Sequence, residues 1–185
     1  RVSSSSGAIE ELGYGKYTTT QSYPGTTADD SAVGTLTWSN TGNITASDDV
    51  RSSVSITTTA ITHYLKATNF DLASKIPVGS TITGVRFTIE KVMIPGTAST
   101  VRDVTVKMVK GGTVVGNNKA DTATNWGGYS AGSADWSDIH YGSDGDLWGT
   151  TLTRAEVIAN DFGVVISANN PSGVGTVTAA IDSIR

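Results

Sequence analysis

The sequence predicts an all-β protein, an antiparallel β-sandwich of jelly-roll type with one short helix and an extended N-terminal arm. Short segments rich in Val, Ile and Thr alternate with turns containing Gly, Asn or Pro along most of the 185 residues. Several of these segments alternate apolar and polar side chains with period two, as expected for strands with one buried face. One helix signal stands out, the capping-box pattern Thr153-Arg154-Ala155-Glu156.

The amino-acid composition excludes several classes of site and partner. Only 16% of the residues are charged, the net charge is −4, and the chain has no Cys. A chain without Cys cannot build a disulfide framework, a thiolate zinc site or a cysteine nucleophile. An acidic chain lacks the basic surface that nucleic-acid binding requires, and no apolar run approaches the ~20 residues that span a bilayer. We therefore expect no cofactor, no nucleic-acid partner and no membrane partner.

Residues 1–27 are predicted to form an arm or linker, and residues 28–185 the sandwich domain. The run Ser3-Ser4-Ser5-Ser6-Gly7 is typical of a flexible linker, and Pro24-Gly25-Thr26-Thr27 carries turn signals. Two interpretations stay open: a disordered tail, or an arm that becomes ordered on a neighbouring subunit. In the second case its apolar and aromatic residues are the interface anchors. These candidates are Ile9, Leu12, Tyr14, Tyr17 and Tyr23.

In the first half of the body, strands are expected over residues 35–38, 54–57, 61–67 and 81–93. The last is the strongest, with Val85, Phe87 and Ile89 on one face. Gly84 lies where the alternation slips by one residue, so we expect a β-bulge there.

In the second half, residues 101–109 form an alternating strand with Val104, Val106 and Met108 directed inward. Gly111-Gly112 is a hairpin signal. A return strand then begins at 114, followed by a weaker strand over 119–126 and a long loop over 127–149. A helix is expected over 153–160, and two final strands over 162–168 and 177–184.

The long loop and the residue before it are rich in aromatic residues, which allow two interpretations. Exposed rings could stack on sugar rings while neighbouring Asp residues accept hydroxyl protons. Alternatively, the rings could pack over the end of the sandwich or against another subunit, because Trp is enriched both in cores and at interfaces. The candidate ligand or packing residues are Trp126, Trp136, Tyr141 and Trp148.

The sequence contains few signals for metal binding or catalysis. Asp144 and Asp146 flank a Gly in the same loop and are weak calcium candidates, because the twelve-residue loop with a terminal Glu is missing. The two histidines, His63 and His140, are too few for a histidine-based metal site, and no P-loop is present. We therefore expect no catalytic residues, no metal site and a protein that is not an enzyme.

A series of short motifs resembles a known group of proteins over about residues 35–185. The motifs are Leu36-Thr37-Trp38-Ser39-Asn40-Thr41-Gly42-Asn43-Ile44, Ile76-Pro77-Val78-Gly79-Ser80, Asp146-Leu147-Trp148-Gly149, Phe162-Gly163-Val164 and Ala180-Ile181-Asp182-Ser183-Ile184. Together they resemble β-sandwich structural proteins of tailed bacteriophage virions, which include head decoration, head-fibre and tail-associated proteins.

The resemblance implies a non-enzymatic structural protein of the extracellular virion. As a capsid decoration protein it would dock on the major capsid protein or other virion proteins through its arm and sheet edges, as a homo-oligomer. Two alternatives stay open. One is a carbohydrate-binding module that holds a glycan with the Trp-rich loop. The other is an extracellular filament subunit that donates its arm as a strand to the next copy.

Overall fold

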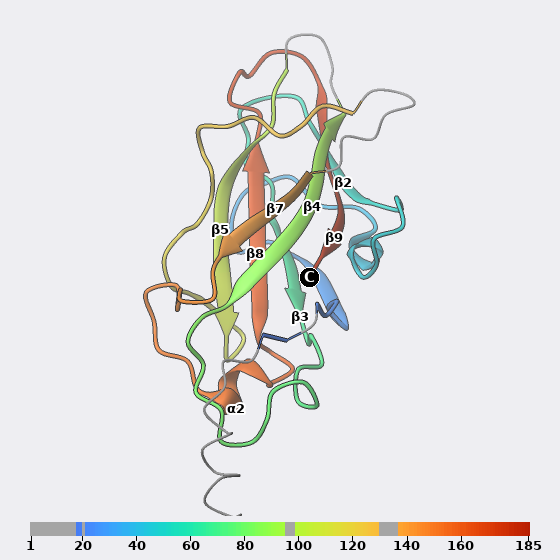
Figure 1. Cartoon of the computed structure of the whole chain (residues 1–185). Helices are drawn as coiled ribbons and strands as arrows, with labels where there is room; N and C mark the ends of the chain where they lie inside the picture. The colour runs from blue at the N-terminus through green and yellow to red at the C-terminus, as the bar shows by residue number, and fades with distance from the viewer. Residues whose placement is uncertain (1–17, 20, 95–98, 130–136) are drawn as a thin grey trace, which may run out of the picture.

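The computed structural model describes residues 18–19, 21–94, 99–129 and 137–185, which form two antiparallel sheets packed face to face (Figure 1). The strands are β1 (Thr26–Asp30), β2 (Ser52–Ile56), β3 (Tyr64–Thr68), β4 (Arg86–Ile94), β5 (Arg102–Lys110), β6 (Thr113–Val115), β7 (Ser137–Gly142), β8 (Gly163–Asn169) and β9 (Val177–Ile184). The helical pieces are a 3-10 turn, η2 (Thr41–Ile44), and the one-turn helix α2 (Arg154–Val157). The predicted all-β antiparallel sandwich is confirmed.

One sheet has the strand order β1-β3-β8-β5-β6 and the other β2-β9-β4-β7. The chain passes from one sheet to the other between β4 and β5, because these two strands follow each other in the chain but belong to opposite sheets. In Figure 1, β4 and β7 pass in front of β5 and β8, the arrangement that lets side chains from these four strands meet in the interior. No helix in the described parts of the chain is long and apolar enough to cross a membrane.

The core lies between the sheets and follows from the alternation of the strands. Leu65, Val106 and Ile166 come from the five-stranded sheet and are fully buried. Phe87 of β4 contacts three other rings: Phe70 at 5.7 Å, Trp148 at 5.7 Å and Phe162 at 6.2 Å between centroids. Full burial of a large apolar side chain contributes about 1.5–3 kcal/mol, so this aromatic group stabilises the end of the sandwich nearest α2.

Two β-bulges change which residues face the core. In β5, Asp103 pairs with Ala168 while Thr105 pairs with Ser167, so Val104 is an extra residue. The prediction that Val104 points inward is therefore wrong: Val104 is half-buried and Asp103 is 1% exposed. In β9, Ser183 pairs with Glu90 and Ile181 with Lys91, which leaves Asp182 as the extra residue.

The predicted bulge at Gly84 is also wrong, because β4 begins only at Arg86. Gly84 is needed for another reason: a Cβ there would lie 2.4 Å from the backbone of Ser143 and Asp144. By contrast, the predicted Gly111-Gly112 hairpin is confirmed. Both glycines have positive φ, 59° and 73°, and they connect β5 to β6.

The remaining differences concern element boundaries. Residues 35–38 contain one isolated bridge, at Leu36, instead of a strand, and the expected strand over 119–126 is absent. β7 lies inside the segment predicted to be a loop, and the helix is shorter than expected although its Thr153–Glu156 capping box is present. β1 includes Thr26 and Thr27, which the sequence assigned to the arm, because both residues pair with β3.

Candidate functional site

The aromatic residues proposed as a ligand or packing loop are divided by the structure. Trp126, Tyr141 and Trp148 are 4%, 3% and 0% exposed, and all three belong to the core. The indole nitrogen of Trp148 donates a hydrogen bond to the carbonyl of Val85 at 2.9 Å. Trp136 lies outside the described residues. The three described rings therefore fill the interior and present no open face on which a sugar could stack.

Two of these rings belong to a buried group that we call the interior cluster: Lys91 of β4, Asp103 of β5, Trp126 and Tyr141 of β7. Lys91 Nζ donates to Asp103 Oδ1 at 2.5 Å and to the Tyr141 hydroxyl at 2.5 Å. The Tyr141 hydroxyl donates to Asp103 Oδ2 at 2.7 Å, and Trp126 Nε1 donates to Asp103 Oδ1 at 2.7 Å. The cluster therefore joins the two sheets through one carboxyl group.

Burial dominates the electrostatics of the interior cluster. Lys91 is 5% exposed, and desolvation lowers the pKa of its ammonium group even though the Asp103 carboxylate acts in the opposite direction. Burial and the neighbouring Asp103 raise the pKa of the Tyr141 hydroxyl far above its ordinary value, so the hydroxyl keeps its proton. Lys91 Nζ also lies 4.7 Å from the centre of the Trp126 ring and 5.2 Å from that of Tyr141.

The interior cluster is not among the sequence-based predictions, although one of its residues carries a signal in the sequence. Lys91 has the same parity as Phe87 and Ile89, so the alternation of β4 does place it on the apolar face. A lysine on such a face is an available signal, because lysine is rarely buried unless paired. Asp103 carries no such signal, since its inward orientation depends on the bulge at Val104.

A second group of charges, the rim cluster, surrounds the bulge in β9 and contains Glu90, Asp138, Asp182 and Arg185. Arg185 reaches Glu90 at 3.1 Å and Asp138 at 2.5 Å. Asp182 is buried; its Oδ2 accepts from the backbone N–H of Asp48 at 3.2 Å, and its Oδ1 has no partner among the described residues. Burial and then the nearby charge of Glu90 raise the pKa of Asp182 to about 6.

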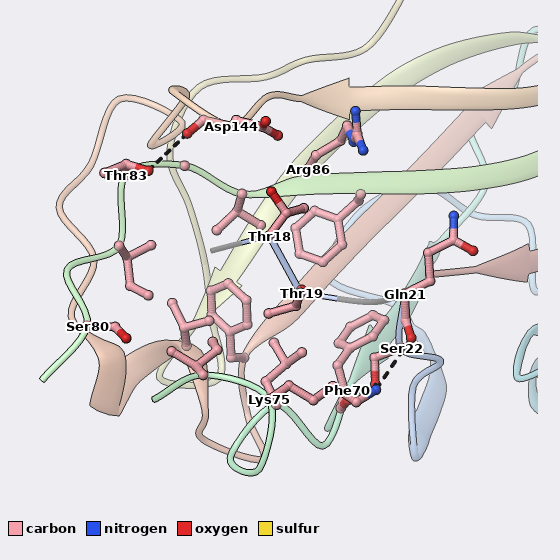
Figure 2. A pocket seen from close by; sticks show the side chains of 18 of the residues that line it. Thr18, Thr19, Gln21, Ser22, Phe70, Lys75, Ser80, Thr83, Arg86 and Asp144 are labelled. Atoms are coloured by element: carbon pink, nitrogen blue, oxygen red, sulfur yellow. Dashed lines mark hydrogen bonds between the residues drawn. The ribbon is translucent and has the colours of Figure 1, made fainter. Parts of the chain in front are cut away.

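A groove of about 770 Å³ opens at the end of the sandwich next to α2. Its apolar lining comes from the loops at this end and from the aromatic part of the core: Phe70, Ile76, Ile82, Val85, Phe87 and Phe162. Thr18, Thr19, Gln21 and Ser22 also line it, and Figure 2 shows them in a row between Arg86 on one wall and Lys75 on the other. The part of the predicted arm that the structure describes therefore lies along this groove.

Short polar contacts fix the course of the chain there. The Ser22 hydroxyl donates to the carbonyl of Phe70. Lys75 Nζ donates to Ser22 Oγ at 2.9 Å, drawn as a dashed line in Figure 2, and to the carbonyl of Gln21 at 3.4 Å. Of the proposed arm anchors, Tyr23 is 39% exposed. Ile9, Leu12, Tyr14 and Tyr17 lie outside the described residues.

The weak calcium candidates do not form a group around one point. Asp146 pairs with Lys119 at 2.7 Å, which lowers the pKa of its carboxyl, and accepts from the backbone N–H of Trp148 at 2.7 Å. The backbone carbonyl of Asp144 accepts from Thr83 at 3.1 Å (Figure 2). Within the described ranges, no three His, Asp or Glu residues are arranged to hold a metal ion.

One short stretch of the loop, residues 128–132, reads Gly-Tyr-Ser-Ala-Gly and matches the G-x-S-x-G pattern of hydrolase nucleophiles. That pattern requires a sharp turn from a strand into a helix. Here Gly128 forms an isolated bridge with Met93, and the next described element is the strand β7. Ser130 itself lies outside the described residues.

Comparison of the chain with protein-family models, curated proteins and solved structures found no match.

Proposed function

We propose that this protein is a structural component of a tailed bacteriophage virion, and specifically a capsid decoration protein that docks through its N-terminal arm. The observation that carries the proposal is the anchoring of residues 21–22 at the groove. These contacts hold Gln21 and Ser22, which belong to the predicted arm, at this end of the sandwich. A particle surface that takes up the arm would therefore face the groove end.

The character of the groove supports the same role. Its walls combine aromatic and aliphatic side chains with Lys75 and Arg86 at the margin. Thr18 and Thr19 are exposed, so the segment lies on the groove without closing it. Apolar contact contributes more to association than exposed charge pairs, which are worth ~0–1 kcal/mol each. We therefore expect docking at the groove end to be driven by apolar residues of the arm.

The test uses virions of the phage that encodes the chain. Immunogold electron microscopy with an antibody to this protein should label the capsid surface at regular positions. Labelling of the tail would support a structural role in the virion but contradict decoration of the capsid. Unlabelled particles would refute both parts of the proposal.

The role of the arm is tested on the same particles after the protein has been stripped and added back. The full chain should rebind and sediment with the capsids, while a variant lacking residues 1–17 should lose at least ~10-fold in affinity, about 1.4 kcal/mol. The matched control is Val174→Ala, an exposed residue in the β8–β9 turn at the opposite end of the sandwich (Figure 1), which should rebind normally. Equal binding by all three proteins contradicts docking through the arm.

A further inference from the structure

The interior cluster places an amine directly against a carboxyl group in the space between the two sheets. Lys91 is 5% exposed and Asp103 is 1% exposed, and the two side chains come from opposite sheets. An ion pair in such a place gains Coulomb energy but loses the hydration of both ions, and that loss is of comparable size. The neutral forms, an amine and a carboxylic acid, are the forms that can react with each other.

Distances within the cluster favour that reaction. Lys91 Nζ is 2.5 Å from Asp103 Oδ1. A nitrogen in hydrogen-bond contact with a carboxyl oxygen lies about 3–3.5 Å from the carboxyl carbon, the separation from which a positioned nucleophile attacks. Both groups are also held in place, because every polar atom of Lys91 and Asp103 side chains has a partner within the cluster.

We propose that Lys91 and Asp103 condense into an isopeptide bond between Lys91 Nζ and Asp103 Cγ, a covalent cross-link that joins the two sheets of the sandwich.

The Tyr141 hydroxyl supplies the path for the protons. It accepts a hydrogen bond from Lys91 Nζ and donates one to Asp103 Oδ2, so it connects the two reacting groups directly. A first proton passes from the ammonium group through this hydroxyl to Oδ2, which leaves a neutral amine beside a neutral carboxylic acid. The lowered pKa of Lys91 and the raised pKa of Tyr141 both assist, since Lys91 gives up its proton more readily and Tyr141 stays protonated between transfers.

The bond then forms in two further steps. The Nζ lone pair attacks Cγ, and the electron pair of the carbonyl moves to Oδ1. A second proton passes from Nζ through Tyr141 to Oδ2, the Cγ–Oδ2 bond breaks, water leaves, and the carbonyl re-forms at Oδ1. One ammonium group and one carboxylate thus become one amide and one water, with no oxidant or added reactant.

Trp126 contributes at the oxygen where negative charge develops. Its Nε1–H donates to Asp103 Oδ1 at 2.7 Å, the geometry of an oxyanion-stabilising donor. The backbone N–H of Asp121 donates to Oδ2 at 3.2 Å, on the oxygen that leaves. Each atom of the carboxyl group that changes charge during the reaction therefore has its own donor.

The decisive measurement is the intact mass of the purified full chain under denaturing conditions. The cross-link predicts a mass about 18 Da below the value calculated from the sequence, the loss of one water. A wild-type protein with the full calculated mass overturns the proposal, whatever the variants do. This readout is independent of any binding partner, so it stands apart from the virion proposal.

Digestion with a lysine-specific protease locates the bond. Lys91 in an amide is not a cleavage site, so residues 76–107 should be recovered as one peptide lacking one water. Separate peptides 76–91 and 92–107 at their calculated masses contradict the bond. A lysine-specific protease does not cleave between Arg102 and Asp103, as trypsin would. Cleavage there adds one water to the cross-linked peptide and would cancel the mass that the cross-link removes.

Three variants separate the cross-link from other losses of water. Lys91→Arg keeps the charge but removes the amine, so this variant should have the full mass calculated from its sequence. If the variant still lacks the mass of one water, the water was lost elsewhere in the chain and the proposal is overturned. Tyr141→Phe should form the bond at least ~10-fold more slowly, because positioned proton transfer contributes about 10²–10⁴ in rate. Tyr64→Phe, a buried tyrosine outside the cluster, should react as the wild type does. Circular dichroism confirms that each variant is folded.

Discussion

Asp182 is expected to destabilise the sandwich at neutral pH, and Asp182→Asn should therefore stabilise it. The carboxyl group is buried in the β9 bulge, its Oδ1 has no partner among the described residues, and its pKa is raised from 3.8 to about 6. Well below pH 3.8 the group is protonated whether the chain is folded or unfolded, so it costs nothing. As the pH rises from 3.8 to about 6, the unfolded chain loses this proton first, and folding becomes less favourable.

The size of the effect follows from the shift. One pKa unit corresponds to about 1.4 kcal/mol, so the rise from 3.8 to about 6 sets an upper limit of ~3 kcal/mol on the cost above pH 6. Relaxation of the surrounding bulge and entry of water reduce this cost, and we expect Asp182→Asn to raise the free energy of unfolding by about 1–2 kcal/mol at pH 7. An asparagine carbonyl at the same place can still accept from the Asp48 backbone N–H.

The assay is urea unfolding of wild type and variant between pH 4 and 7.5. The difference in unfolding free energy should be close to zero at pH 4 and should grow as the pH rises to 6. Using the difference removes the opposite contributions of carboxyl groups that are not coupled to Asp182 and have a lowered pKa, such as Glu156, which accepts hydrogen bonds from Thr153 and Lys110. The control is Asp161→Asn, which removes a carboxyl group at an exposed turn instead of a buried one. A pH-independent gain, or a loss of stability at pH 7, would refute the reasoning.

Two further substitutions test local features of the fold by urea unfolding. Gly84→Ala places a Cβ 2.4 Å from the backbone of Ser143 and Asp144 and should lower the free energy of unfolding by about 1–3 kcal/mol. The control Gly145→Ala has open space around the new Cβ and should lower it by less than about 1 kcal/mol. Equal losses of stability would contradict the close approach at Gly84. Thr153→Ala removes the cap that accepts from the Glu156 backbone N–H and should cost about 1 kcal/mol, and an unchanged unfolding midpoint would show that the cap does not stabilise α2.

Local signals predicted those parts of the fold whose cause lies within a few residues. The alternation around Phe87 and Ile89 placed both side chains in the core, and Gly111-Gly112 marked the hairpin because its turn needs two residues with positive φ. The capping box marked the start of α2 because Thr153 and Glu156, three residues apart, each accept a hydrogen bond from the other's backbone N–H. In each case the residues that determine the structure are neighbours in the sequence.

Features that depend on distant partners were not predicted. The sequence predicts a loop at β7, because Ser137–Gly142 is polar and lies in a Gly-rich stretch. The segment becomes a strand by pairing with β4, about fifty residues earlier. The buried roles of Trp126 and Tyr141 follow from the Asp103 carboxyl group that they contact. The sequence therefore singles out Trp126 and Tyr141 as aromatic residues, but their orientation toward the interior depends on a residue from another strand.

The bulge in β5 explains how the interior cluster can exist in an otherwise apolar core. Asp103 and Val106 are three residues apart, and in a regular strand residues at odd separation point to opposite faces. Both are buried here because the extra residue, Val104, resets the alternation between them. Without the bulge, either Asp103 would leave Lys91 unpaired in the core, or Val106 and Met108 would turn toward solvent. The chain keeps its apolar residues inside and adds one carboxyl group, opposite the one lysine that β4 directs inward. A strand irregularity thus converts a packing surface into a site with defined chemistry, and it does so in a protein that has no cysteine with which to cross-link its two sheets.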